Sequence, residues 1–352
     1  VIDSYRGLYF KANRFELYNV LYKTRLFSRI LAPITFFDAH DEDYLYKRSK
    51  EIEWDQFISV DQTFSIHANV GNSNIRHSKF ASLRLKDAIC DYFREKYGRR
   101  PDVDRDNPDL SLNLFVNKNQ ATINVDLGGG ALHKRAYRQV TGDAPIAETL
   151  AAAMIRHSGW DGECPLYDPM CGSGTIAIEA MLHYCRIPSG SLRKKFSLFC
   201  LPDFSQEIWD KIVTQAHSQI RPLPENLIFA SDASTRSLEM LRTNMSAFKE
   251  SENIEITQSR FQDLTDLHNV VIVTNPPYGI RLNGGDDMKE FVGELGDFLK
   301  QQCTGTTAWV YFGERQLIRN VGLRASRKIP MSNGGLDGRL AKFEMYAGTK
   351  NP

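Results

Sequence analysis

The chain of 352 residues lacks several features that would assign it to familiar protein classes. It has no run of about 18 apolar residues, which a membrane-spanning helix needs. Its six cysteines form no C-x-x-C pair, so reduced thiols and no bound metal are the simplest expectation. No charged and then apolar leader follows Val1, so we expect no signal peptide. These absences favour a cytoplasmic protein without a membrane partner.

A large excess of charge of either sign is also missing, since the net charge is +1. The distribution is uneven. Residues 1–140 carry 22 Lys and Arg against 18 Asp and Glu, a balance of +4, and the remainder balances at −3. Such a small basic excess suits either a solvated surface or a contact with nucleic acid, and both readings stay open at this stage. The length favours two or three domains.

A glycine turn stands out within Leu166-Tyr-Asp-Pro-Met-Cys-Gly-Ser-Gly-Thr175, where a short apolar strand runs through an acidic residue into a helix. Small residues there let backbone approach a ligand, and the N–H groups of the new helix favour electron-rich groups. The G-x-x-x-x-G-K-[ST] form is missing, so phosphoryl transfer is disfavoured. Cys171 has no evident His partner and is expected to pack rather than to attack a substrate.

Alternating strands and helices after residue 141 predict an α/β domain with a mostly parallel sheet that ends in an antiparallel hairpin, over 324–329 and 341–346 around a glycine-rich loop at 332–338. Parallel strands bring their carboxyl ends to one edge, where ligands bind. Asp232 ends one strand and can accept both hydroxyls of a ribose, and Asp263 after the next can accept an amino group such as that of adenine. A lone carboxylate there is more often a cap, but the ordered set predicts an adenosine site.

The motif Asn275-Pro276-Pro277-Tyr278 follows the next expected strand, at 269–274. A planar amino group is a poor nucleophile because its lone pair is delocalised. If the Asn275 side-chain oxygen and the Pro276 carbonyl accept its two protons, the nitrogen is held for in-line attack and its developing positive charge is stabilised. Tyr278 can stack on a flat base. In isolation such a motif is more often only a rigid turn after a strand.

Basic residues gather in the N-terminal part of the chain. Contacts with phosphate and stacked bases would use such groups, although a solvated helix face and a flexible basic linker look similar. The candidates lie on an expected helix at 77–97, just after it, and beyond a triple glycine: Arg76, Lys79, Lys86, Arg99, Arg100, Arg105, His133, Lys134, Arg135, Tyr137 and Arg138.

Two sets of motifs resemble known families. Asp168-Pro-Met-Cys-Gly-Ser-Gly-Thr175 with Asn275-Pro-Pro-Tyr-Gly279 resembles the S-adenosylmethionine-dependent amino-methyltransferases. Arg76-His-Ser-Lys-Phe80 and the stretches at 101–109, 132–138 and 144–150 resemble the THUMP-containing bacterial 23S rRNA guanine-N2 methyltransferases. The second resemblance covers essentially the whole chain.

This resemblance implies a Rossmann-like class I methyltransferase domain at 141–352 with a mostly parallel seven-stranded sheet. An α+β THUMP-type RNA-binding module at 1–140 would precede it, beginning with the end of a truncated ferredoxin-like subdomain. The implied reaction moves a methyl group from S-adenosylmethionine to the N2 amino group of a flipped guanine in 23S rRNA, free or in a precursor particle. We expect a monomer with no second activity.

The resemblance also implies the residues of the site. The catalytic residues would be Asn275, Pro276, Pro277 and Tyr278. The cofactor would contact Pro145, Glu148 and Thr149 at its methionine end, Asp168, Pro169, Met170, Cys171, Gly172, Ser173 and Gly174 along its length, Asp232 and Ala233 at the ribose, Gln262 and Asp263 at the adenine, and Asn275.

Other functions stay open. Related THUMP enzymes modify guanines of tRNA, and the sequence separates the two substrates poorly. DNA adenine and protein glutamine methyltransferases share the Asn-Pro-Pro-Tyr motif but leave the N-terminal half unexplained. A non-catalytic RNA-binding factor of ribosome assembly would not need Asp232, Asp263 and Asn275, which are all present.

Overall fold

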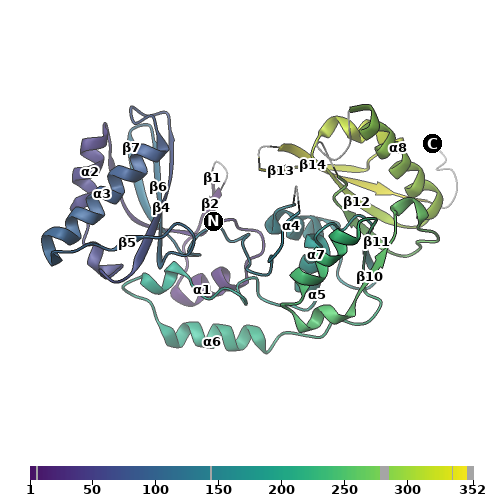
Figure 1. The fold of residues 1–352 in the computed structure, drawn as a ribbon, viewed down its shortest axis with the longest axis horizontal. Coiled ribbons are helices and arrows are strands. Elements are labelled where there is room, and N and C mark those ends of the chain that lie inside the picture. The colour runs from purple at the N-terminus through teal and green to yellow at the C-terminus, as the bar shows by residue number, and fades with distance from the viewer. Residues whose placement is uncertain (5–6, 143–144, 278–284, 335, 347–352) are drawn as a thin grey trace. The chain divides into compact units, whose positions relative to one another are not determined.

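The computed structural model describes residues 1–4, 7–142, 145–277, 285–334 and 336–346 (Figure 1). They pack into two units, and each unit is built from stretches that are not contiguous in the sequence. The first holds residues up to 132, except 24–26, together with 193–214, and the second holds 24–26 and the rest. The division therefore falls before the expected boundary at 140, because 133–140 packs with the second unit. No helix of the described residues is long and apolar enough to cross a membrane.

A five-stranded sheet forms the centre of the first unit, in the order β3-β7-β6-β4-β5. Figure 1 shows α2 and α3 together on one side of it. The expected helix at 77–97 is confirmed as α3, and β6 and β7 form a hairpin with Lys118 and Asn119 in its turn at positive φ. The elements are β1 (Ile2–Ser4), β2 (Gly7–Tyr9), α1 (Arg14–Lys23), β3 (Leu31–Asp38), α2 (Glu42–Lys50), η1 (Trp54–Gln56), β4 (Thr63–Gly71), α3 (Ser78–Tyr97), β5 (Asp102–Val103), β6 (Leu110–Asn117) and β7 (Gln120–Asp126).

The residues at 193–214 belong to the first unit although they lie between elements of the second. They contain η2 (Ser197–Cys200) and most of α6 (Gln206–His217). The Ser197 hydroxyl accepts the N–H of Ser111 on β6 at 2.8 Å, and Lys195 pairs with Asp109 at 2.9 Å. The chain thus inserts part of the first unit between two segments of the second.

A seven-stranded sheet organises the second unit, in the order β10-β9-β8-β11-β12-β14-β13. The first five strands are parallel to one another, and β14 runs antiparallel to both of its neighbours, β12 and β13. The expected mostly parallel sheet is confirmed, but the final hairpin continues into the expected glycine-rich loop at 332–338. The elements are α4 (Glu148–Ser158), β8 (Leu166–Asp168), α5 (Thr175–Tyr184), β9 (Ile228–Asp232), α7 (Thr235–Met245), η3 (Lys249–Asn253), β10 (Ile254–Gln258), η4 (Phe261–Asp263), β11 (Val271–Thr274), α8 (Gly285–Gln302), β12 (Thr307–Phe312), η5 (Arg315–Val321), β13 (Arg327–Asn333) and β14 (Leu336–Glu344).

Helices cover both faces of this sheet. Apolar residues of α4, α5 and α7 pack on one face against side chains such as Leu166 and Val273. Residues of α8 and η5 pack on the other face against Ile272 and Val310. Successive strand residues contact opposite layers, as expected for strands buried on both sides. The helices cover the faces of the sheet but not the edge formed by the carboxyl ends of its parallel strands.

Gly296 sets how closely α8 approaches η5. A methyl group on it would overlap the backbone carbonyl of Val321, whereas one on Gly293, a turn earlier, would lie 3.8 Å from the nearest atom, the Asn320 carbonyl oxygen. Replacing helical Gly by Ala ordinarily stabilises by up to about 1 kcal/mol. We expect Gly296→Ala to destabilise by about 1–3 kcal/mol through overpacking. Gly293→Ala should be at least as stable as the wild type.

Thermal unfolding of the two variants checks this. Equal melting temperatures for Gly296→Ala and Gly293→Ala would contradict the close helix contact.

Candidate active site

Polar side chains meet at the carboxyl ends of four neighbouring strands. Asp168 ends β8, Asp232 ends β9, and Asn275 follows β11, while Gln262 lies in η4 after β10. These strands are adjacent and parallel in the order β10-β9-β8-β11, so their ends lie along one edge of the sheet. The predicted motifs are thus brought together by the strand order.

A cavity of about 600 Å³ lies at this edge. Residues that the sequence did not suggest also line it, including Arg260, Glu290 and Phe291. Four predicted cofactor residues, Glu148, Thr149, Gly174 and Asp263, are absent from the lining. The predicted residues that line it are Pro145, Asp168, Pro169, Met170, Cys171, Gly172, Ser173, Asp232, Ala233, Gln262, Asn275, Pro276 and Pro277. Tyr278 lies outside the described residues.

The turn between β8 and α5 depends on glycine. Gly172 has φ of 54° and Gly174 has φ of 83°, in the left-handed region that other residues rarely adopt. A methyl group on Gly174 would also overlap the Leu241 side chain. The role of Gly174 in this structure is therefore to shape the turn and to let α7 approach it.

Asp232 holds the same turn. Its Oδ2 accepts the N–H of Gly172 at 2.9 Å, and its Oδ1 accepts the N–H of Ser234 at 2.9 Å. The carboxylate thus joins the ends of β8 and β9 while it lines the cavity.

Asp168 is the buried acid of the site, with 1% of its surface exposed. Its Oδ1 accepts the Thr274 hydroxyl at 2.7 Å and the N–H of Met170 at 3.3 Å. Burial raises the pKa of Asp168 to about 7, and the charge of Asp232 adds to this rise, against the two hydrogen bonds. A cation in the cavity would favour its ionised form.

The Asn275 side chain presents an unused acceptor. Its Oδ1 is buried and has no hydrogen-bond partner within the described part of the chain. A buried oxygen without a partner is costly, so a donor from a ligand is the natural complement. Pro276 is buried beside it and Pro277 is half-buried.

Asn244 on α7 connects the stretch before the cavity to the glycine turn, and no motif in the sequence points to it. It is 1% exposed. Its Oδ1 accepts the N–H groups of Gln139 and Val140 at 2.8 and 3.0 Å, and its Nδ2 donates to the Ser173 carbonyl at 3.2 Å.

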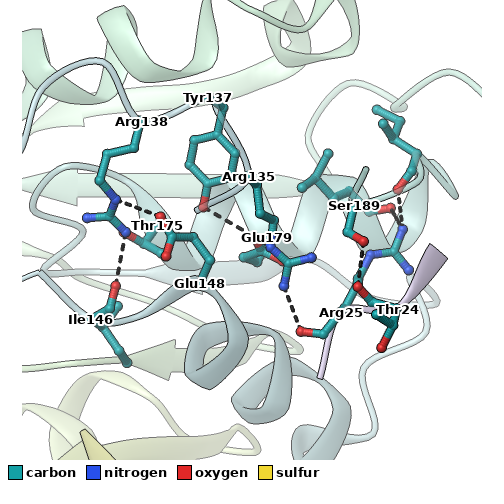
Figure 2. Close-up of polar contacts among 12 residues, drawn as sticks. Thr24, Arg25, Arg135, Tyr137, Arg138, Ile146, Glu148, Thr175, Glu179 and Ser189 are labelled. Carbon is teal, nitrogen blue, oxygen red and sulfur yellow. Dashed lines mark hydrogen bonds and ion pairs between the residues drawn. The ribbon is translucent and has the colours of Figure 1, made fainter. Parts of the chain in front are cut away.

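The prediction that Arg135 and Tyr137 contact RNA is wrong, because both side chains are buried (Figure 2). Arg135 is 2% exposed and forms an ion pair with Glu179 of α5 at 3.0 Å. The Tyr137 hydroxyl donates to the same carboxylate at 3.2 Å, and Arg135 also donates to the carbonyl of Arg25 at 2.7 Å. The sequence did contain one indication of a buried cation, because Glu179 is the only acidic residue in the mainly apolar helix α5.

The prediction for Arg138 is also wrong. Its guanidinium donates to the Glu148 carboxylate at 2.8 Å and to the Ile146 carbonyl and the Thr175 hydroxyl at 3.0 Å each (Figure 2). Only 14% of its side chain is exposed. The same contacts correct the prediction for Glu148, whose buried carboxylate binds Arg138 instead of lining the cavity.

Asp263 differs from its predicted place as well. It is exposed at the end of η4, while its neighbour Gln262 lines the cavity and donates to Glu294 of α8 at 2.7 Å. Phe261 is buried against Phe291 and Phe298 and so fixes the direction of this short helix.

The basic residues of the first unit fall into two groups. Arg76, Lys79 and Arg105 are exposed, and no ion pair is recorded for them within the described ranges. Lys86 pairs with Asp87 at 2.7 Å, Arg99 pairs with Asp61 at 2.8 Å, and Arg100 lies 3.7 Å from the Cys90 sulfur. Of the predicted basic residues in the second unit, His133 is half-buried and Lys134 is exposed.

Family models match both parts of the chain. Residues 135–342 match the RMKL-like methyltransferase domain, and residues 39–126 match the THUMP domain. A Synechocystis sp. protein provisionally named RNA methyltransferase slr0064 is 35% identical over 347 residues, which cover 98% of this chain and 90% of that protein.

Two further proteins extend the comparison. The ribosomal RNA large subunit methyltransferase K/L of Syntrophotalea carbinolica is 32% identical over 98% of this chain, which spans half of that relative's length. The crystal structure of a possible methylase from Clostridium difficile 630 superposes with a TM-score of 0.79 at 27% identity and covers 96% of this chain and 89% of that one. The chain belongs to the RMKL-like family of S-adenosylmethionine-dependent methyltransferases that carry a THUMP domain.

Proposed function

We propose that this protein transfers a methyl group from S-adenosylmethionine to the N2 amino group of a guanine in 23S rRNA. The observation that carries the proposal is the buried Oδ1 of Asn275, which has no hydrogen-bond partner among the described residues and lies in a cavity lined by strand-end carboxylates. The name of the Syntrophotalea carbinolica relative, a ribosomal RNA large subunit methyltransferase, supports this choice of RNA.

The residues of the cavity fit this cofactor. Its volume of about 600 Å³ lies within the range of cofactor sites. S-adenosylmethionine carries a sulfonium and an ammonium cation, and when bound it supplies an electrophilic methyl group. The carboxylates of Asp168, Asp232 and Glu290 line the cavity and would offset these charges. Gly172 would let backbone lie against the cofactor, and Asp232 would accept ribose hydroxyls.

Asn275 would orient the substrate nitrogen. Its Oδ1 would accept one N–H of the guanine amino group, and the carbonyl of Pro276, fixed in direction by the proline rings, would accept the other. Two acceptors leave the nitrogen lone pair free to attack and stabilise the positive charge that grows on it. The proton becomes acidic once the nitrogen carries the methyl group, so this chain needs no strong base.

Mass spectrometry of nucleosides tests the reaction. Large-subunit rRNA and tRNA from a strain without this enzyme are each incubated with the protein and S-adenosylmethionine. We expect new N2-methylguanosine in rRNA only. The same product in tRNA only would overturn the choice of substrate, and cofactor binding without methylation of either RNA or of precursor particles would favour an RNA-binding factor.

The variant Asn275→Ala tests the role of the side-chain oxygen. It should keep cofactor affinity, measured by calorimetry, and lose at least about 100-fold in turnover, because a preorganised acceptor for the transition-state charge is gone. Near-normal turnover of the variant would exclude the proposed role.

Asp168 gives a prediction for pH. Its pKa is near 7 in the folded protein and near 4 in an unfolded chain. Between these values the folded state binds the extra proton, so stability falls as the pH rises from about 4 to about 7 and then levels off. Asp168→Asn removes this loss and keeps an acceptor for Thr274.

We therefore expect ligand-free Asp168→Asn to melt several degrees above the wild type at pH 8 and near it at pH 4, and to bind the cationic cofactor more weakly. The difference between variant and wild type isolates this carboxyl group from others that titrate. A melting-temperature difference that is the same at both pH values would contradict the raised pKa.

Arg138 would act on the cofactor through its neighbours, as a positioning residue. It joins the Ile146 carbonyl to the Thr175 hydroxyl, and both of these residues line the cavity. Arg138→Gln with Glu148→Gln removes the ion pair without leaving a buried charge alone. The double variant should raise Kd and KM for S-adenosylmethionine about 10-fold, in line with the loss of a charged hydrogen bond, with kcat changed little.

The matched control is Arg135→Gln with Glu179→Gln. Arg135 lies three residues before Arg138, Glu179 is on α5, and neither residue lines the cavity. The control should lower the melting temperature and keep cofactor affinity within about twofold. Equal losses of affinity in both double variants would assign Arg138 to stability alone.

A further inference from the structure

We propose that the open end of the sheet in the first unit is a stacking platform for unpaired RNA bases. The proposal rests on RNA as the substrate of the proposed function and concerns how the first unit holds it. The platform consists of Phe36, Phe115, Thr122 and Asn69, with the cations Arg76, Lys79 and Lys118 around it.

The strand register places the four platform residues in one row. Phe36 of β3 is opposite Thr122 of β7, Thr122 is opposite Phe115 of β6, and Phe115 is opposite Asn69 of β4. Directly paired residues point to the same face of a sheet. The neighbours of this row, Phe37 and Ala121, point to the other face and are buried. The two rings are two strands apart, or about 10 Å.

This face becomes more open along its length. Ser111, Asn113 and Asn124 lie on the same face further from the β6–β7 turn and are buried. At the proposed platform Phe36 is 78% exposed and Phe115 is 48% exposed. Large aromatic rings exposed beside polar neighbours call for a partner with apolar faces.

Cations surround this end of the sheet. Lys118 lies in the β6–β7 turn next to the platform and is exposed. The loop that leads to Arg76 and Lys79 is fastened to the same turn, since Asn119 Oδ1 accepts the N–H of Asn74 at 2.9 Å and the Ser73 hydroxyl at 3.0 Å. No ion pair is recorded for these three cations within the described residues, so their charges are available for phosphates.

Carboxylates lie at the same end of the sheet. Asp38 is in the row beyond Phe36, opposite Gln120, and is exposed. Asp41, Glu42 and Asp43 follow it at the start of α2, where Asp41 caps the helix and Asp43 pairs with Arg84. The rings and their polar neighbours, rather than net charge, therefore decide the kind of partner.

The pattern of polar and apolar groups selects the partner. The two rings are separated by Thr122 and followed by Asn69, so they do not form the continuous apolar patch of a protein interface core. Bases offer an apolar face for each ring and polar edges for the hydroxyl and amide between them. Aromatic stacking with nearby cations is the usual means of holding single-stranded RNA without strict sequence preference. Unpaired RNA therefore fits this surface better than a protein partner.

Fluorescence anisotropy of the full chain with a labelled 12-nucleotide single-stranded RNA of mixed sequence tests the platform. Phe36→Ala and Phe115→Ala should each weaken binding about 10-fold, because each removes one stacked base. Phe80→Ala is the matched control, since Phe80 is 49% exposed on α3 and is not a residue of the sheet. It should stay within about twofold of the wild type.

Two further readouts make the assignment specific. Lys118→Gln should reduce the slope of log Kd against log salt by about 1, whereas Lys47→Gln on α2 should leave it unchanged. RNA that carries 5-iodouridine should crosslink to peptides that contain Phe36 or Phe115.

Several outcomes would overturn the platform. Equal effects of the Phe36, Phe115 and Phe80 variants would do so, as would crosslinks confined to other peptides. A fall in melting temperature for Phe36→Ala and Phe115→Ala with unchanged RNA affinity would assign the rings to packing within the first unit. Wild-type protein that methylates rRNA but does not bind the single strand would overturn the platform alone, and ring-dependent binding without methylation of any RNA would overturn the proposed reaction alone.

Discussion

The turn between β8 and α5 is held by hydrogen bonds from three separate segments, and the rest of the site depends on them. The N–H of Gly172 is bound by Asp232 of β9, and the carbonyl of Ser173 is bound by Asn244 of α7. Arg138 binds the hydroxyl of Thr175 at the start of α5. A turn with two residues at positive φ has few other ways to be fixed. The glycines allow this shape of the turn, but contacts from distant parts of the chain hold it.

The strands and the edge at which their polar groups meet were predictable because each strand carries a strong local signal. A buried run that ends in Asp168, in Asp232 or before Asn275 predicts both the strand and the edge at which the polar groups meet. The parallel sheet then brings residues more than a hundred positions apart to one cavity. Asp263 shows the limit of this reasoning. The short helix η4 turns Gln262 to the cavity instead, and the burial of Phe261 that sets this direction cannot be seen in the motif.

The misassigned arginines fail for a related reason. Charge and an aromatic neighbour describe Arg135 and Tyr137 equally well on a surface or in a buried network, because composition does not report burial. The missing information was the partner, Glu179, which lies 44 positions after Arg135 in an apolar helix. An acid in such a helix needs a cation, and the nearest basic segment that could supply one was the one interpreted as an RNA contact.

The buried ion pairs also explain why the stretch after the THUMP domain functions as part of the methyltransferase domain. Replacing a buried pair by apolar side chains is often neutral for stability, so Arg138 and Glu148 are poorly explained as a source of folding energy. An apolar pair could fill the same space, but it could not bind the Ile146 carbonyl and the Thr175 hydroxyl together. The charged pair instead holds Ile146 and Thr175, which line the cavity, in a single arrangement relative to each other. The boundary between the domains in the sequence is thus not a boundary of the site, because residues 135–140 help to form the cavity through their contacts.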